Sequence, residues 1–163
     1  MLAWAHDHLA NARALADLDA QRQNAASLRR AVSTSYYALF QALCDVCARR
    51  FVGDEAPFEI FTPVFRTFKH RAAAAALHPS QYTEGSDLKF LATAFVELQK
   101  LREWADYNPE PRPDFKPTTN NTPFTRAEAL RSIELAESAV QRLGSLDGEA
   151  RLRLAANILY KSR

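Results

Sequence analysis

The stretch LRRAVSTSYYALFQ, residues 28–41, lies within the longest helical pattern of the chain. From about Asn24 to Phe51, apolar residues recur at steps of three and four, which places them along one side of an α-helix. The residues of this stripe are Leu28, Val32, Leu39, Leu43 and Val46. Gly53 then supplies a C-terminal stop signal. A helix of about seven turns is long for a globular protein, so we expect it to be the central helix of the fold.

The remaining sequence also has helical patterns. Helices are predicted over residues 2–22, 62–77, 86–107, 125–144 and 147–160. Ser86 and Thr125 are N-cap residue types, and Thr62 followed by Pro63 has the appearance of a cap and first turn. The sequence has no strand pattern, and its four glycines argue against a turn-rich β-fold. These patterns predict an all-α bundle of five to six helices.

The 163 residues suit a single domain. We expect a core over residues 2–107, an extended proline-rich connection over 108–123 and C-terminal helices over 125–160. Residues of the AVILMFWYC set make up 47% of the chain and charged residues 25%, which is typical of a soluble globular protein. The net charge of +2 permits a nucleic-acid partner without requiring one.

The chain shows no signal-peptide or membrane-spanning pattern. The N-terminal residues MLAWAHDHLANAR contain polar residues where a signal peptide needs an apolar run. Cys44 and Cys47 are the only cysteines, so no disulfide framework is predicted. Their C-x-x-C spacing lacks the second pair that a zinc site would need. We therefore expect a cytoplasmic protein with no membrane association, no metal and no cofactor.

One arginine lies on the apolar stripe of the helix predicted over residues 86–107. Arg102 falls in the middle of this stripe, and Asp106 follows one turn later, where it can pair with Arg102. Two interpretations stay open. The pair can fix helix packing, or the guanidinium can be held in a cleft to bind phosphate through two parallel hydrogen bonds.

The central helix has polar residues on its apolar side as well. Arg29 lies between Val32 and Tyr36 on that side, and Ser33 lies near its edge. Tyr36 and the adjacent Tyr37 are either core residues with hydrogen-bonded hydroxyl groups or part of a site. Because an unpaired buried charge is costly, we expect the stripes that carry the two arginines to face one cleft.

The predicted third helix contains an arginine and a histidine one turn apart. Arg66 and His70 are expected to share a helix face. In a functional site the imidazole would move protons and the guanidinium would stabilise developing negative charge. The alternative is that His70 is a solvated surface histidine.

Three segments together resemble a known family. LRRAVSTSYYALFQAL at 28–43 resembles the central-helix signature of bacterial HEPN domains, R-R-A-x-S-x-x-Y-Y-A-x-F-H. VFRTFKH at 64–70 and KLREWADYNP at 100–109 resemble the later blocks of one HEPN subgroup, in which an arginine precedes an A-D-Y triplet. The resemblance covers residues 28–109 and implies an up-and-down helical bundle that forms a homodimer, with the functional cleft between protomers.

The resemblance also implies a function. Many HEPN proteins are metal-independent endoribonucleases of toxin–antitoxin, phage-defence or CRISPR-linked systems, and others are non-catalytic nucleotide-binding or interaction modules beside a nucleotidyltransferase. Arg66 and His70 lie closer in sequence than the arginine and histidine of the family's catalytic motif, and Gln41 stands where many relatives have a histidine. Both functional alternatives therefore stay open, together with a purely structural bundle.

These considerations define the candidate site. The expected catalytic residues are Arg102, His70, Asp106, Tyr107 and Arg66. The residues expected to bind nucleic acid or a nucleotide are Arg29, Ser33, Tyr36 and Tyr37. If the protein cleaves RNA, His70 would be the acid or base, Arg102 the phosphate clamp, and the 2′-hydroxyl of the substrate the nucleophile. Expected partners are RNA or a nucleotide, a second copy of the chain, and an antitoxin or nucleotidyltransferase.

Overall fold

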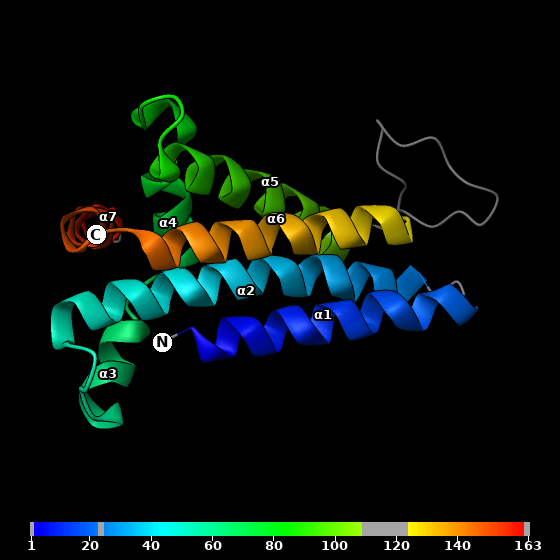
Figure 1. Ribbon diagram of the computed structural model, residues 1–163, viewed down its shortest axis with the longest axis horizontal. Helices are drawn as coiled ribbons and strands as arrows, with labels where there is room; N and C mark the ends of the chain where they lie inside the picture. The colour runs from blue at the N-terminus through cyan, green and yellow to red at the C-terminus, as the bar shows by residue number, and fades with distance from the viewer. Residues whose placement is uncertain (1, 23–24, 109–123, 162–163) are drawn as a thin grey trace.

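The computed structural model describes residues 2–22, 25–108 and 124–161. Within these ranges the chain forms seven α-helices, one short 3-10 helix and no strand (Figure 1). The elements are α1 (Ala3–Arg22), α2 (Ala25–Val52), α3 (Phe58–Phe65), α4 (His70–Ala76), η1 (Pro79–Gln81), α5 (Asp87–Tyr107), α6 (Arg126–Ser145) and α7 (Gly148–Tyr160). The predicted all-α class is confirmed. The connection predicted over 108–123 lies outside the described residues, apart from Asn108.

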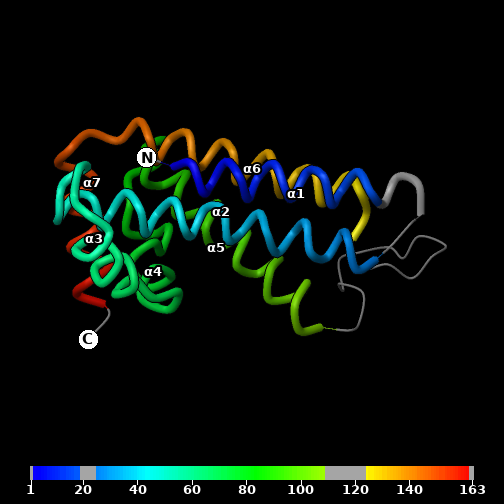
Figure 2. The backbone as a smooth tube through the Cα atoms, turned by 90° about the horizontal axis from the view of Figure 1, so that it is seen from below, coloured from blue at the N-terminus to red at the C-terminus, as the bar shows by residue number. Residues whose placement is uncertain are grey.

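The predicted central helix is at the centre of the fold. α2 packs against α1, α3, α5, α6 and α7. α1, α2 and α6 run side by side along the length of the molecule (Figure 1), and α5 crosses α2 obliquely (Figure 2). Most residues of α2 between Leu28 and Ala48 are buried, so this helix supplies a large part of the core. The helix ends before Gly53, whose φ of 91° is a conformation that glycine adopts without a steric penalty.

The helix starts predicted at Ser86 and Thr125 are confirmed. The Ser86 side chain accepts a hydrogen bond from the backbone N–H of Lys89 at the start of α5. Thr125 and Glu128 form a reciprocal capping box at the start of α6. The Asp147 side chain caps α7. These bonds satisfy N–H groups that have no partner within a helix.

The prediction of one helix over residues 62–77 is wrong. α3 begins after Pro57, and Pro63 lies inside it, so Thr62 is not an N-cap. The helix ends at Phe65, where Thr67 Oγ1 donates to the carbonyl of Val64 at 2.6 Å and satisfies an end group of the helix. The backbone at Lys69 is extended, with φ −110° and ψ 146°, and α4 begins at His70.

The break between α3 and α4 allows residue 68 to reach the core. Phe68 is buried, although it lies between exposed neighbours. Burial of a phenylalanine side chain contributes roughly 1.5–3 kcal/mol, which helps to offset the loss of helical hydrogen bonds at the break. α3, α4 and α7 gather at the C-terminal end of α2 (Figures 1 and 2). Among the described residues, no helix is both long and apolar enough to cross a lipid bilayer.

Candidate functional site

A cluster of aromatic and charged side chains lies where α2, α4 and α5 meet. We call it the Arg102 cluster. Its members are Tyr36, Tyr37 and Phe40 of α2, His70 of α4, and Arg102, Asp106 and Tyr107 of α5. Three helices that are distant in sequence therefore supply one site.

The guanidinium of Arg102 is surrounded by tyrosine side chains. Its Nη2 donates to the hydroxyl of Tyr37 at 2.8 Å and to that of Tyr107 at 3.3 Å. Its central carbon lies 5.9, 5.5 and 5.1 Å from the ring centroids of Tyr36, Tyr37 and Tyr107. At these distances the positive charge is attracted to the faces of the rings. The tyrosine side chains thus hold the guanidinium in place, and because they are uncharged they do not neutralise it.

The predicted pair between Arg102 and Asp106 is present. Nε of Arg102 lies 2.8 Å from Oδ2 of Asp106. This N–H is buried and makes no hydrogen bond of suitable geometry, so the carboxylate acts on Arg102 mainly through its charge. A guanidinium has five N–H donors, and the two on Nη1 of Arg102 have no partner within the described residues. Within the described chain, these two donors are available for an anion.

His70 is an exposed residue whose ring is held by side chains of α2. Its Nδ1 lies 2.8 Å from the hydroxyl of Tyr36, and its ring stacks on Phe40 with 3.7 Å between centroids. The rings of Tyr36 and Tyr37 also contact the imidazole, yet the residue as a whole is exposed. Partial burial, and then the positive charge of Arg102, lower the pKa of His70 from 6.5. The imidazole is therefore neutral at pH 7, and Nε2 has no partner among the described residues.

Tyr36 lies against both the imidazole of His70 and the guanidinium of Arg102. It is buried in α2, with 1% of its surface exposed, and burial raises the pKa of its hydroxyl above the ordinary value of 10.0. The phenol therefore stays protonated at neutral pH. Its hydroxyl contacts His70, while the guanidinium of Arg102 lies near its ring. A rigid core residue thus positions an imidazole and a guanidinium relative to each other.

Other predicted site residues lie outside the Arg102 cluster. Arg29 donates from Nη1 to the carbonyl of Ala105 at 2.9 Å, and from Nη2 to the carbonyl of Asn108. It therefore holds the C-terminal end of α5 instead of pointing into a cleft. The hydroxyl of Ser33 is buried in α2 without a hydrogen-bond partner in the described chain.

Arg66 does not share a helix face with His70. That prediction is wrong because α3 ends at Phe65 and α4 starts at His70. The Arg66 side chain is exposed and makes no hydrogen bond or ion pair within the described residues, and its carbonyl accepts a hydrogen bond from Nζ of Lys69. The arginine that accompanies His70 in the structure is Arg102.

Phe40 belongs to the Arg102 cluster, although it is not among the site residues predicted from the sequence. Phe40 follows Tyr36 by one helical turn, so both rings lie on the same side of α2. Their rings are stacked, with 6.2 Å between centroids, and both contact His70. The four-residue spacing of Tyr36 and Phe40 was the feature of the sequence that could have placed Phe40 beside the site.

The described residues contain no group of three or more His, Cys, Asp or Glu side chains that could hold a metal ion. Cys44 and Cys47 are buried free thiols. Burial raises the pKa of Cys44 to about 12 and also raises that of Cys47, so both thiols stay protonated at neutral pH. Neither is therefore in the thiolate form that binds metals or acts as a nucleophile.

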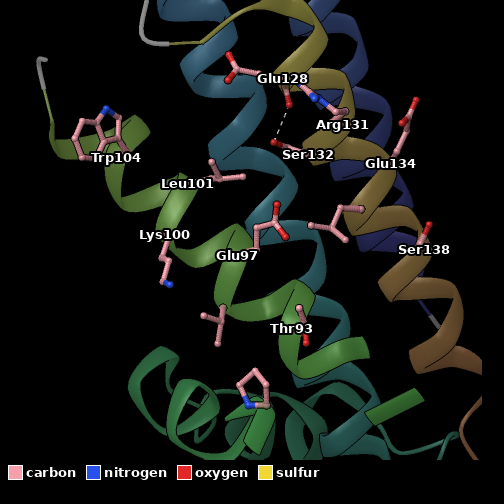
Figure 3. A pocket seen from close by; sticks show the side chains of 13 residues that line it. Thr93, Glu97, Lys100, Leu101, Trp104, Glu128, Arg131, Ser132, Glu134 and Ser138 are labelled. Atoms are coloured by element: carbon pink, nitrogen blue, oxygen red, sulfur yellow. Dashed lines mark hydrogen bonds between the residues drawn. The ribbon is translucent and has the colours of Figure 1, made fainter. Parts of the chain in front are cut away.

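A wide groove lies on another side of α5. It runs between α5 and α6 with a volume of about 980 Å³ (Figure 3). Its charged lining residues are Glu97, Lys100, Glu128, Arg131 and Glu134, which give an excess of negative charge. Trp104 also lines the groove, about 200° around the helix from Arg102. The groove is thus separate from the Arg102 cluster, and its charge disfavours binding of a phosphate backbone.

Comparisons with known proteins give no match. No family model, no curated protein and no solved structure matches this chain. The geometry of the Arg102 cluster is therefore the main observation from which a function can be argued.

Proposed function

We propose that the chain is a HEPN-like RNA-binding protein and that the Arg102 cluster is a metal-independent endoribonuclease site. The observation that carries this proposal is the convergence of His70 and Arg102 on Tyr36. The Tyr36 hydroxyl lies 2.8 Å from Nδ1 of His70, and its ring centroid lies 5.9 Å from the guanidinium carbon of Arg102. A neutral imidazole lies beside a guanidinium whose Nη1 donors have no partner among the described residues. This arrangement combines a base with a phosphate-binding group.

The proposed reaction uses the 2′-hydroxyl of RNA as nucleophile. With its proton on Nδ1, His70 donates to the oxygen of Tyr36, and Nε2 is free to accept the proton of the 2′-hydroxyl. The 2′-oxygen then forms a bond to the adjacent phosphorus while the bond from phosphorus to the 5′-oxygen breaks. The His70 imidazolium, directly or through water, returns the proton to the 5′-oxygen. The products are a 2′,3′-cyclic phosphate and a 5′-hydroxyl end.

Arg102 would stabilise the negative charge that develops on the phosphate oxygens. Its two Nη1 donors have no partner in the described chain and can bind these oxygens. The tyrosine rings keep the guanidinium in place, so little reorganisation is needed when charge develops. DNA lacks the 2′-hydroxyl and would not be cleaved by this route.

The test is cleavage of RNA by the purified protein in the presence of EDTA. We expect Arg102→Gln and His70→Gln each to reduce the rate by about 10²–10³-fold. The matched controls are Arg142→Gln, which removes an exposed ion pair with Asp87 at 2.8 Å, and His78→Gln, which alters an exposed histidine that contacts Ser80. Equal activity in the wild type and both site variants would reject the site.

A second candidate function is nucleotide binding without cleavage, as a module that partners a nucleotidyltransferase or another effector. The 2.8 Å pair with Asp106 favours it, because the carboxylate reduces the positive charge available at Arg102. In this case the purified protein would leave RNA intact, whereas Arg102→Gln would still weaken nucleotide binding. The products of the RNA assay distinguish the two functions.

The proposal extends to the setting in which the protein works. From the resemblance of residues 28–109 we infer a cytoplasmic homodimer that belongs to a toxin–antitoxin or phage-defence system. Sedimentation of the purified protein would test the dimer. Growth arrest on expression, relieved by an adjacent gene, would test the antitoxin.

A further inference from the structure

Tyr107 combines high exposure with contact to the cation of the Arg102 cluster. It is the last residue of α5, and 71% of its surface is exposed. Its ring centroid lies 5.1 Å from the guanidinium carbon of Arg102, and its hydroxyl accepts a hydrogen bond from Nη2. Despite this contact, most of the surface of Tyr107 is exposed. A flat aromatic surface is therefore left open next to the group proposed to bind phosphate.

The backbone that carries Tyr107 is held in place. Arg29 of α2 donates to the carbonyl of Ala105 and to that of Asn108, so its two bonds bracket Tyr107. The backbone N–H of Asn108 also bonds to the carbonyl of Trp104. Helix ends often fray, but these bonds hold the backbone from which the Tyr107 side chain projects. Arg29 thus stabilises the helix end that carries Tyr107.

We propose that Tyr107 is a stacking platform for a base adjacent to the phosphate bound by Arg102, so that the substrate class is single-stranded RNA. This inference rests on the proposed function of the Arg102 cluster. Stacking of a base on an aromatic side chain tolerates any sequence, because every base has a flat face. Bases within a duplex are stacked on one another and cannot reach an external ring unless they leave the stack. The platform therefore selects unpaired segments.

The test measures binding, so that it does not depend on cleavage. The probe is a short single-stranded 2′-fluoro RNA, which lacks the nucleophile, compared with an abasic strand that has the same number of phosphates. Fluorescence anisotropy at one fixed salt concentration gives both dissociation constants. We expect Tyr107→Leu to weaken binding of the strand with bases by roughly 5- to 150-fold. Binding of the abasic strand should change much less, because Tyr37 and Asp106 still hold Arg102. Tyr107→Phe should keep most of the affinity for the strand with bases.

The matched control is Tyr160→Leu. Tyr160 is also an exposed tyrosine beside a cation, with 69% of its surface exposed and Nζ of Lys161 at 5.8 Å from its ring centroid. It belongs to α7 and lies outside the Arg102 cluster. Its replacement should leave both dissociation constants unchanged.

Arg102→Gln separates failure of this inference from failure of the proposed function. If Arg102→Gln weakens both strands while Tyr107→Leu weakens neither, or weakens both equally, the phosphate site stands and the platform is rejected. If Arg102→Gln weakens neither strand, the proposed function itself is rejected. A selective effect of Tyr107→Leu on the strand with bases, together with weakening of both strands by Arg102→Gln, supports both.

Discussion

The hydroxyl of Tyr36 lies 2.8 Å from Nδ1 of His70, which links the buried face of the central helix to the first residue of α4. Tyr36 is buried, whereas His70 is exposed. The imidazole is therefore oriented by a residue that cannot itself move far, because close packing restricts Tyr36. This contact makes an exposed histidine a defined part of the Arg102 cluster.

Tyr36→Phe should lower both stability and activity. The substitution removes the hydrogen bond to His70, so the free energy of unfolding should fall by about 1 kcal/mol. RNA cleavage should fall as well, because the imidazole loses its orientation. Urea denaturation and the EDTA cleavage assay measure the two effects. Tyr82→Phe is the control, since it removes a 2.7 Å bond from a tyrosine hydroxyl to the carbonyl of Ala76. Tyr82→Phe should lower the free energy of unfolding by a similar amount and keep full activity. A loss of activity in Tyr82→Phe as large as that in Tyr36→Phe would contradict the role of Tyr36.

Arg102→Gln should raise the pKa of His70. The positive charge of Arg102 is one of the two causes that lower this pKa from 6.5, and burial is the larger. Removing the charge favours the protonated imidazole, so the histidine should titrate at a higher pH than in the wild type. An NMR titration of the imidazole resonances measures the shift. Arg142→Gln should leave the titration of His70 unchanged, and an unchanged value in Arg102→Gln would show that the two groups are not coupled.

His70 should make the protein less stable in acid. Because its pKa is lower in the folded state than the unperturbed 6.5, the unfolded state binds more protons between the two values. Stability therefore falls as the pH drops from 6.5 to the lower folded-state pKa, and this contribution is constant below it. Comparing urea unfolding of the wild type and His70→Gln at about pH 8 and about pH 5 isolates this effect from other titrating groups. The wild type should lose more stability than the variant, and equal losses would contradict the shift.

Arg29→Met should destabilise the end of α5. The variant keeps most of the apolar stem but loses hydrogen bonds to the carbonyls of Ala105 and Asn108. Bonds that involve a charged group are worth about 1.5–3 kcal/mol each in favourable cases, and Arg29 is half-buried, so we expect a loss of about 2 kcal/mol in the free energy of unfolding. Arg30→Met, at the exposed neighbouring position, should change stability by less than about 0.5 kcal/mol. Equal effects of the two variants in urea denaturation would show that Arg29 does not hold α5.

Local interactions explain why much of the fold could be predicted. The apolar stripe of α2 and the capping residues Ser86 and Thr125 act over one or two helical turns, so the sequence alone reveals them. Thr62 and Pro63 have the same local appearance, yet they lie inside α3. Their position was decided by the chain around them, including burial of Phe68 between α3 and α4.

The same distinction applies to the site. Arg102 and Asp106 pair across one turn of a single helix, and this contact followed from their spacing. The sequence also determined that an arginine lies on the apolar side of α2, but not that Arg29 ends at the carbonyl groups of α5. Only the packing of α4 and α5 against α2 brings His70 and Arg102 around Tyr36, because side-chain contacts between helices depend on crossing geometry that no single helix encodes.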